Sequence, residues 1–299
     1  MPLAIPEPRE SGFTSTTPVP LYWVRYGDPS RPTLVVLHGG PGADHRYLLP
    51  QMLHLAQEYD LVLYDQRGGG RSRTSTSAPV TWRDHVADLA SVCREHAVAD
   101  PSLLGYSWGG MLAMLYAIES LADPALPQPL SLALVSPAPI TSEYRREFDE
   151  DLRRRSNAPV IVAAREALMA SGLRERDPEA YRQRIFELGV SGYFADPSDA
   201  HDLTPFRVVG RVQQSTWESL GDFDLRPVLK AVSSVPSCIV VGRDDPIPTA
   251  SSKDAARAMQ TEIVLIDKCG HVPYVERPAE LWEVLDPFLS RTAAAKSRA

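Results

Sequence analysis

Short apolar runs alternate along the chain with longer segments whose apolar residues recur at helical spacing. The short runs are typical of buried strands and occupy residues 21–26, 33–37, 61–64, 101–104, 130–135, 237–241 and 262–266. The segments with helical spacing cover residues 48–55, 81–96, 111–118, 252–259 and 279–289. Alternating strands and helices with strongly apolar strands predict an α/β fold, in which helices cover both faces of a mostly parallel sheet.

The pattern changes between residues 140 and 222, where helical spacing continues and strand signals are few. Residues 143–187 contain ten Arg and ten Asp or Glu, and such a balance favours solvent-exposed helix faces over a site for a polyanion. We therefore predict a core domain from residues 1–139 and 223–299, with residues 140–222 inserted as a helical cap. Residues 1–11 are expected to form a loose arm, and residues 291–299 a frayed helix end.

A glycine-rich turn follows the central apolar run. Gly105 and Gly109 flank Ser107, and the segment after them has helical character. A strand, a Gly-x-Ser-x-Gly turn and a helix in this order form a nucleophile elbow, which presents a serine hydroxyl at the start of a helix. Glycine is needed there because a side chain would not fit in so tight a turn. Ser107 is thus a candidate nucleophile.

A serine nucleophile needs a base that accepts its proton. Among the seven histidines, His271 alone follows a glycine, Gly270, in the loop after the last predicted strand. We predict His271 as the base. His38 belongs to a glycine loop, and we expect packing or surface roles for the others, which are His45, His54, His85, His96 and His201.

The base needs an acid that holds its tautomer. Asp244 and Asp245 follow the strand that ends at Gly242, and they precede His271 in the order Ser, acid, His that is typical of α/β-hydrolases. We favour Asp245, which lies three residues after Gly242. Asp244 remains the alternative.

Two backbone N–H donors are needed for the oxyanion of a tetrahedral intermediate. One is predicted at Trp108, directly after the serine. The other is expected from the loop His38–Gly42, at Gly40, since Pro41 has no N–H. Gly39 beside it is a candidate substrate contact. The Gly-rich loop 65–72 lacks the endings of phosphate-binding loops, so we interpret it as a tight structural loop near the site.

Composition excludes several other classes. The net charge of −7 argues against a nucleic-acid-binding protein, and no apolar run is long enough for a membrane span. No signal peptide is evident. The three cysteines (Cys93, Cys238 and Cys269) match no zinc spacing, so neither metal nor cofactor is expected, and a cytoplasmic location is predicted.

Four motifs together resemble the proline iminopeptidase family of α/β-hydrolases. They are residues 38–42, residues 65–72, residues 105–110 and the terminal pair Gly270-His271. The resemblance implies a serine hydrolase with the α/β-hydrolase fold and a helical cap, which removes an N-terminal residue, often proline, from peptides. It also implies Ser107, Asp245 and His271 as the catalytic triad, with Gly40 and Trp108 as oxyanion donors.

The chain departs from this family at the site for the substrate amine. Family members bind the amine with acidic residues of the cap and sometimes with one directly after the triad aspartate, where this chain has Pro246. Glu187 and Glu218 are the candidates that remain for the amine.

The sequence therefore predicts a cofactor-free serine hydrolase. An aminopeptidase acting on a short peptide or amino-acyl amide is the first hypothesis. An esterase, lactonase or amidase for a small metabolite is the second. Lyase or perhydrolase chemistry and a non-catalytic binding module are further alternatives, and the oligomeric state is not indicated.

Overall fold

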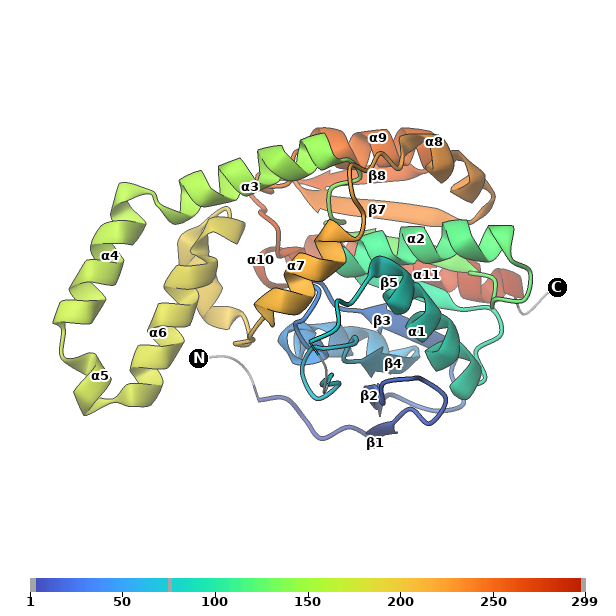
Figure 1. The fold of residues 1–299 in the computed structure, drawn as a ribbon, viewed down its shortest axis with the longest axis horizontal. Coiled ribbons are helices and arrows are strands. Elements are labelled where there is room, and N and C mark those ends of the chain that lie inside the picture. Colours follow the sequence, from blue (N-terminus) through green and yellow to red (C-terminus); the bar gives the residue numbers. More distant parts are fainter. Residues whose placement is uncertain (1–3, 75–76, 297–299) are drawn as a thin grey trace.

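The computed structural model describes residues 4–74 and 77–296. In these residues the strands form one eight-stranded sheet, with the order β1-β2-β4-β3-β5-β6-β7-β8 (Figure 1). The strands are β1 (Glu10–Phe13), β2 (Tyr22–Tyr26), β3 (Thr33–Leu37), β4 (Asp60–Tyr64), β5 (Ser102–Tyr106), β6 (Ser131–Val135), β7 (Ser237–Gly242) and β8 (Glu262–Ile266). Strands β1 and β2 pair antiparallel, as do β2 and β4, and the remaining neighbours pair parallel.

Both faces of the sheet are buried under helices. Along β3, Val35 and Leu37 pack into one apolar cluster, whereas Leu34 and Val36 pack into the other. This alternation follows from the two-residue repeat of a strand. The first cluster lies under α1 (Trp82–Glu95), α2 (Trp108–Ala122), α8 (Arg226–Leu229), η5 (Lys230–Ser234) and α9 (Thr249–Met259). The second lies under the short 3₁₀ helices η1 (His45–Leu48) and η2 (Gln51–Gln57), α10 (Pro273–Glu276) and α11 (Pro278–Lys296). The predicted fold class is confirmed.

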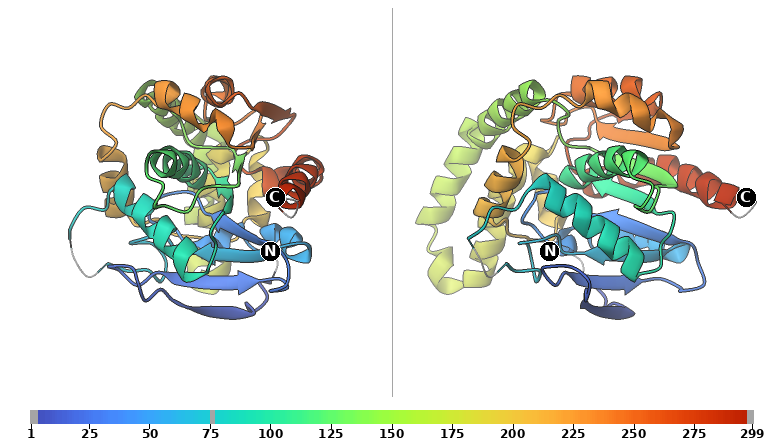
Figure 2. Two further views of the ribbon diagram at one scale, coloured as in Figure 1. Left: turned by 90° about the vertical axis from the view of Figure 1, so that its right-hand side faces the viewer. Right: turned by 45° about the vertical axis from the view of Figure 1, so that its right-hand side comes forward.

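The segment 140–222, which we call the cap segment, leaves the sheet after β6 and returns before α8. Its two ends lie side by side, since Thr141 forms an isolated antiparallel bridge with Asp224. The segment contains α3 (Ser142–Ser156), α4 (Pro159–Ala170), α5 (Leu173–Arg176), α6 (Pro178–Val190), η3 (Ser191–Tyr193), η4 (Pro197–Asp202) and α7 (Gly210–Glu218). Helices α4, α5 and α6 extend away from the sheet and pack against one another, whereas α7 lies against the core (Figures 1 and 2).

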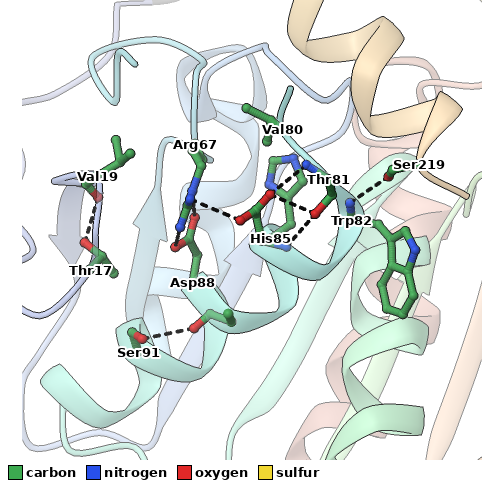
Figure 3. Close-up of polar contacts among 12 residues, drawn as sticks. Thr17, Val19, Arg67, Val80, Thr81, Trp82, His85, Asp88, Ser91 and Ser219 are labelled. Atoms are coloured by element: carbon green, nitrogen blue, oxygen red, sulfur yellow. Dashed lines mark hydrogen bonds and ion pairs between the residues drawn. The ribbon is translucent and has the colours of Figure 1, made fainter. Parts of the chain in front are cut away.

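Helix α7 is fastened to the N-terminal end of α1. The backbone N–H of Val80 donates to the Ser215 hydroxyl at 3.0 Å, and that of Trp82 donates to the Ser219 hydroxyl at 3.0 Å. Figure 3 shows the second of these contacts. One long wall of the cap segment is therefore attached to the core.

Both chain ends are more ordered than expected. Residues 10–13 form β1 at the sheet edge, so the predicted loose arm is wrong at residues 10 and 11. Helix α11 continues to Lys296, so the predicted fraying is wrong over residues 291–296. Residues 1–3 and 297–299 lie outside the described residues. Among the helices that the structure describes, none is long and apolar enough to cross a membrane.

Candidate active site

Ser107 sits at a strained turn between β5 and α2. Its backbone has φ 54° and ψ −118°, a conformation that side-chain-bearing residues rarely adopt. The turn leaves no room on either side, because a Cβ on Gly105 would lie 2.3 Å from the Gly109 carbonyl oxygen, and one on Gly109 would lie 2.1 Å from that of Leu37. The two glycines thus allow the backbone to turn, and the serine hydroxyl is half-buried at the helix start.

The structure brings Ser107, His271 and Asp245 together. The Nε2 atom of His271 lies 2.9 Å from Ser107 Oγ, and its Nδ1 atom lies 3.0 Å from both carboxylate oxygens of Asp245. An ionised carboxylate only accepts hydrogen bonds, so Nδ1 carries the proton and Nε2 is left to accept from the serine hydroxyl. Both His271 and Asp245 are buried. The arrangement is that of a nucleophile, a base and an orienting acid.

Asp244 does not reach His271. Asp244 is exposed to solvent, and its backbone N–H donates to the carbonyl of Cys269 at 2.9 Å. Of the two adjacent aspartates, Asp245 is the one whose carboxylate contacts the imidazole.

The backbone around His271 is held by Glu276 and by the cap segment. The buried carboxylate of Glu276 accepts the N–H groups of Gly270 at 2.9 Å, Val272 at 3.0 Å and Ala195 at 2.8 Å. The N–H of His271 itself donates to the carbonyl of Tyr193 at 2.7 Å. Burial raises the pKa of Glu276, while the three N–H donors act in the opposite direction. Glu276 therefore ties the histidine loop to residue 195 of the cap segment.

Two backbone N–H groups beside Ser107 are available to an oxyanion. Trp108 is the first residue of α2, so its N–H has no acceptor within the helix. Within the described residues, the N–H of Gly40 also lacks a hydrogen-bond acceptor, and Gly40 adopts φ +57°. The predicted oxyanion donors are thus both unpaired.

Gly39 is a packing residue of this loop. Its N–H donates to the Tyr47 hydroxyl at 2.5 Å, and its carbonyl accepts from His38 Nδ1 at 2.9 Å. A Cβ at this position would lie 2.7 Å from the Cβ of Ser107. We had expected Gly39 to contact the substrate. Its polar groups are already paired and it does not line the cavity, so it is not placed for this role.

A buried network connects the glycine loop with the nucleophile turn. The backbone N–H of Gln66 donates to His38 Nε2 at 3.0 Å, so the His38 proton is on Nδ1, which holds the Gly39 carbonyl. The Gln66 side chain donates to the His38 carbonyl at 2.7 Å and accepts from Trp108 Nε1 at 2.9 Å. Burial lowers the pKa of His38, which keeps the ring neutral. The carbonyl of the Gly39–Gly40 peptide is consequently held by His38, whose ring is held in turn by Gln66.

A cavity of about 250 Å³ opens beside Ser107 and His271, between the sheet and the cap segment. Its walls are rich in aromatic side chains, which include Tyr47, Tyr106, Phe148, Tyr193, Phe206 and Trp217. The charged side chains that line it among the described residues are Arg145 and Asp149, both on α3. A predominantly apolar cavity with few polar groups is typical of a small-molecule site.

Neither Glu187 nor Glu218 lines this cavity. Glu187 is nearly buried on α6 and accepts from Arg184 at 2.7 Å and Gln183 at 3.0 Å. Glu218 is exposed and accepts from Gln214 at 2.7 Å. The structure thus separates both predicted amine-binding carboxylates from Ser107.

The loop after β4 is occupied by structural contacts. The Asp65 carboxylate accepts from the backbone N–H of His45 at 3.1 Å and of Arg71 at 2.8 Å. Arg67 pairs with Asp88 and Asp84 of α1 (Figure 3). In the described part of the chain, no group of three or more His, Cys, Asp or Glu residues is placed to hold a metal ion.

Comparison with known proteins identifies the family of the chain. The family model described as "Alpha/beta hydrolase family" matches residues 34–284 of the chain. The chain belongs to the alpha/beta hydrolase family. This alpha/beta hydrolase is 28% identical over 286 residues to a proline iminopeptidase of Lactobacillus helveticus, with 87% of this chain and 90% of that protein covered. The predicted resemblance to proline iminopeptidases is therefore confirmed.

Solved structures show the same hydrolase fold. A proline iminopeptidase-related protein from Thermus thermophilus has a TM-score of 0.73 at 21% identity, with 96% of this chain and 99% of that chain covered. A structure from a study of Nitrososphaera gargenis carboxylesterases has a TM-score of 0.69 at 16% identity, with coverage of 96% and 100%. At these identities, the two likenesses establish the fold of this alpha/beta hydrolase alone.

Several residues that shape the site were not identified from the sequence. Tyr47, Gln66 and Glu276 form hydrogen bonds with backbone groups of the loops around Ser107 and His271, and nothing in their local sequence indicates this. Arg145 and Asp149 were counted with the solvent-exposed charges of the cap segment. Their spacing of four residues was the available signal, since it places both on one side of a helix.

Proposed function

We propose that this protein is a serine hydrolase that works through an acyl-enzyme. Ser107 Oγ attacks the carbonyl carbon of an amide or ester while its proton passes to His271 Nε2. The N–H groups of Gly40 and Trp108 stabilise the negative carbonyl oxygen. His271 then protonates the leaving amine or alcohol as the bond to the carbonyl carbon breaks. Water, deprotonated by His271, attacks the acyl-enzyme and releases the acid and Ser107.

One observation carries this proposal. An uninterrupted hydrogen-bonded chain runs from Ser107 through His271 to buried Asp245, and its serine end faces the cavity. Asp245 is held in turn by the N–H of Ile247, which donates to its carboxylate at 2.8 Å. A fixed acid keeps the imidazole in the tautomer that accepts the serine proton.

The first candidate substrate is a short peptide or amino-acyl amide with N-terminal proline or another small residue. The proline iminopeptidase relatives, which align over most of both chains, support this choice. The compact aromatic cavity is also of a size for a small acyl group.

A second candidate is an ester or amide that has no free amine. The observation in its favour is that Asp149, the carboxylate of the cavity wall, already accepts from Arg145, and that Pro246 follows Asp245. A substrate ammonium would compete with Arg145 for that carboxylate. Transferring a cation from water into a mostly apolar cavity is unfavourable without such a partner.

Labelling with a fluorophosphonate tests the mechanism. The wild-type protein should be modified at Ser107, and Ser107→Ala should not be modified. Ser233→Ala, which changes an exposed serine, serves as the matched control and should be labelled like the wild type. Absence of labelling in folded wild-type protein would remove the serine mechanism.

The two substrate classes are separated by kcat/KM on prolyl-naphthylamide, its N-acetylated form and a simple 4-nitrophenyl ester. A strong preference for the free amine establishes the aminopeptidase. Equal rates with and without the acetyl group, or turnover of the ester alone, establish the second candidate.

A further inference from the structure

The cavity contains a cation whose hydrogen-bonding capacity is only partly used. Arg145 lies on α3, lines the cavity and has a side chain that is 23% exposed. Its Nε donates to both oxygens of Asp149 at 3.0 Å. In the residues that the structure describes, the two Nη atoms of Arg145 have no acceptor, which leaves four N–H donors unpaired.

The guanidinium is held in place by aromatic rings. Its central carbon lies 4.0 Å from the ring centroid of Trp217 on α7 and 5.6 Å from that of Phe148 on α3. Contacts of this kind fix the plane of an arginine side chain. Its unpaired donors are thereby held in one orientation, as a binding site for a planar group requires.

A second polar side chain of the wall is also unpaired. Gln213 lies on α7 and lines the cavity, and within the described residues its side-chain amide has no hydrogen-bond partner. By contrast, the carboxylate of Asp149 is already engaged, because the single Nε–H of Arg145 is shared between its two oxygens. The unpaired groups of Arg145 and Gln213 are therefore mainly N–H donors, and donors fit an oxygen-rich, anionic group better than an ammonium.

We propose that Arg145 binds a carboxylate of the substrate, remote from the bond that is cleaved. The substrate class is an ester or amide whose small acyl or leaving group ends in a carboxylate. Guanidinium matches this planar group by paired N–H···O bonds, which a neutral side chain does not provide. This inference rests on the proposed serine hydrolase and specifies its substrate.

The test compares mono-4-nitrophenyl adipate, which carries a terminal carboxylate, with 4-nitrophenyl hexanoate, its neutral counterpart. The measured quantity is the ratio of their kcat/KM values at pH 7.5. We expect the wild-type ratio to exceed one. In Arg145→Gln the ratio should fall about tenfold to hundredfold, the range expected for a lost charge-assisted hydrogen bond. Arg145→Lys keeps the charge without the planar donor pair and should give an intermediate ratio.

Arg146→Gln is the matched control, because Arg146 is the exposed neighbour on the same helix. It should leave the ratio at the wild-type value. A wild-type ratio of one or less overturns the inference without any variant. An unchanged ratio in Arg145→Gln, with both esters slowed equally, also overturns it, since Arg145 would then only support the packing of α3 on α7. If wild type hydrolyses neither ester faster than Ser107→Ala does, the proposed function itself fails and this inference with it.

Discussion

The carboxylate of Glu276 accepts the backbone N–H of Gly270 at 2.9 Å, so a buried acid braces the residue directly before His271. The same carboxylate accepts the N–H of Val272, on the other side of the histidine. His271 donates its own N–H to Tyr193. The position of the imidazole between Ser107 and Asp245 is therefore maintained from the backbone as well as from the side chain.

Glu276→Gln should lower kcat with little change in KM. The amide keeps one acceptor oxygen but turns an NH₂ group toward a backbone N–H, which displaces the loop. We expect a fall of about tenfold in kcat, because small misplacements of a catalytic group are costly. The exposed Glu280→Gln is the control.

A double-mutant cycle separates positioning from general destabilisation. If Glu276 acts through His271, Glu276→Gln should have little further effect on the residual ester hydrolysis of His271→Ala. Equal effects in both backgrounds would show that Glu276 does not work through the histidine.

Asp245→Asn should reduce kcat by about 10⁴-fold, as in the corresponding change of a well-studied serine protease triad, because an amide stabilises the wrong imidazole tautomer. Asp244→Asn alters the exposed neighbour and should stay within threefold of wild type, a range typical of a surface change. Steady-state kinetics on a 4-nitrophenyl ester checks both variants. A large loss in Asp244→Asn with an active Asp245→Asn would reverse the assignment.

Tyr47→Phe should slow acylation. The Tyr47 hydroxyl accepts the N–H of Gly39, and without it this buried N–H is unpaired, which costs about 1–3 kcal/mol. The loop that presents Gly40 is then less well held. We expect a fall of about tenfold in kcat, smaller than the loss of an entire oxyanion donor. Fluorophosphonate labelling rates provide the check, and an unchanged rate would argue against Gly40 as a donor held in place by this contact.

His85 makes the contact between α1 and α7 sensitive to acid. Its ring is buried, packs against Trp108 and contacts the Thr216 hydroxyl at 3.3 Å (Figure 3 shows its place on α1). Burial lowers the pKa of His85 to about 3, below the 6.5 of an unperturbed histidine. Between these values the unfolded chain binds a proton that the folded chain does not, so stability falls as the pH decreases from 6.5 toward 3.

The difference between the two pKa values of His85 lowers the free energy of unfolding by about 2–3 kcal/mol at pH 4.5 relative to pH 7. His85→Gln should reduce the gap between urea unfolding free energies at pH 7.0 and 4.5 by about that amount. The control is His201→Gln, since His201 is exposed. Identical gaps in wild type and His85→Gln would contradict the prediction.

The fold could be predicted because each buried strand has an apolar run and each strand end at the site carries glycine or a catalytic residue type. The grouping of Ser107, His271 and Asp245 could be predicted for the same reason, since each lies in a local motif at a strand end. The segment 48–55 was predicted as one helix from its leucines, yet it forms η2 and part of η1. Apolar spacing does not distinguish a 3₁₀ helix from an α-helix over so short a length.

The walls of the cavity could not be predicted from the sequence. Which charged residues of α3 face the cavity depends on how α3 is placed over the sheet, and Arg145 lines the cavity whereas its neighbour Arg146 is exposed. Glu187 was one of the two carboxylates predicted for the substrate amine. Its partners Arg184 and Gln183 on the same helix already occupy its carboxylate.

The attachment of α7 to α1 has a consequence for the orientation of Arg145. Trp217 lies on α7, which is attached to the core through Ser215 and Ser219. Arg145, which stacks on Trp217, lies on α3, and α3 is followed by the outer helices α4, α5 and α6 (Figure 1). A motion that parts α3 from α7 must therefore break the stacking of Arg145 on Trp217. The orientation of the guanidinium therefore depends on the relative position of α3 and α7.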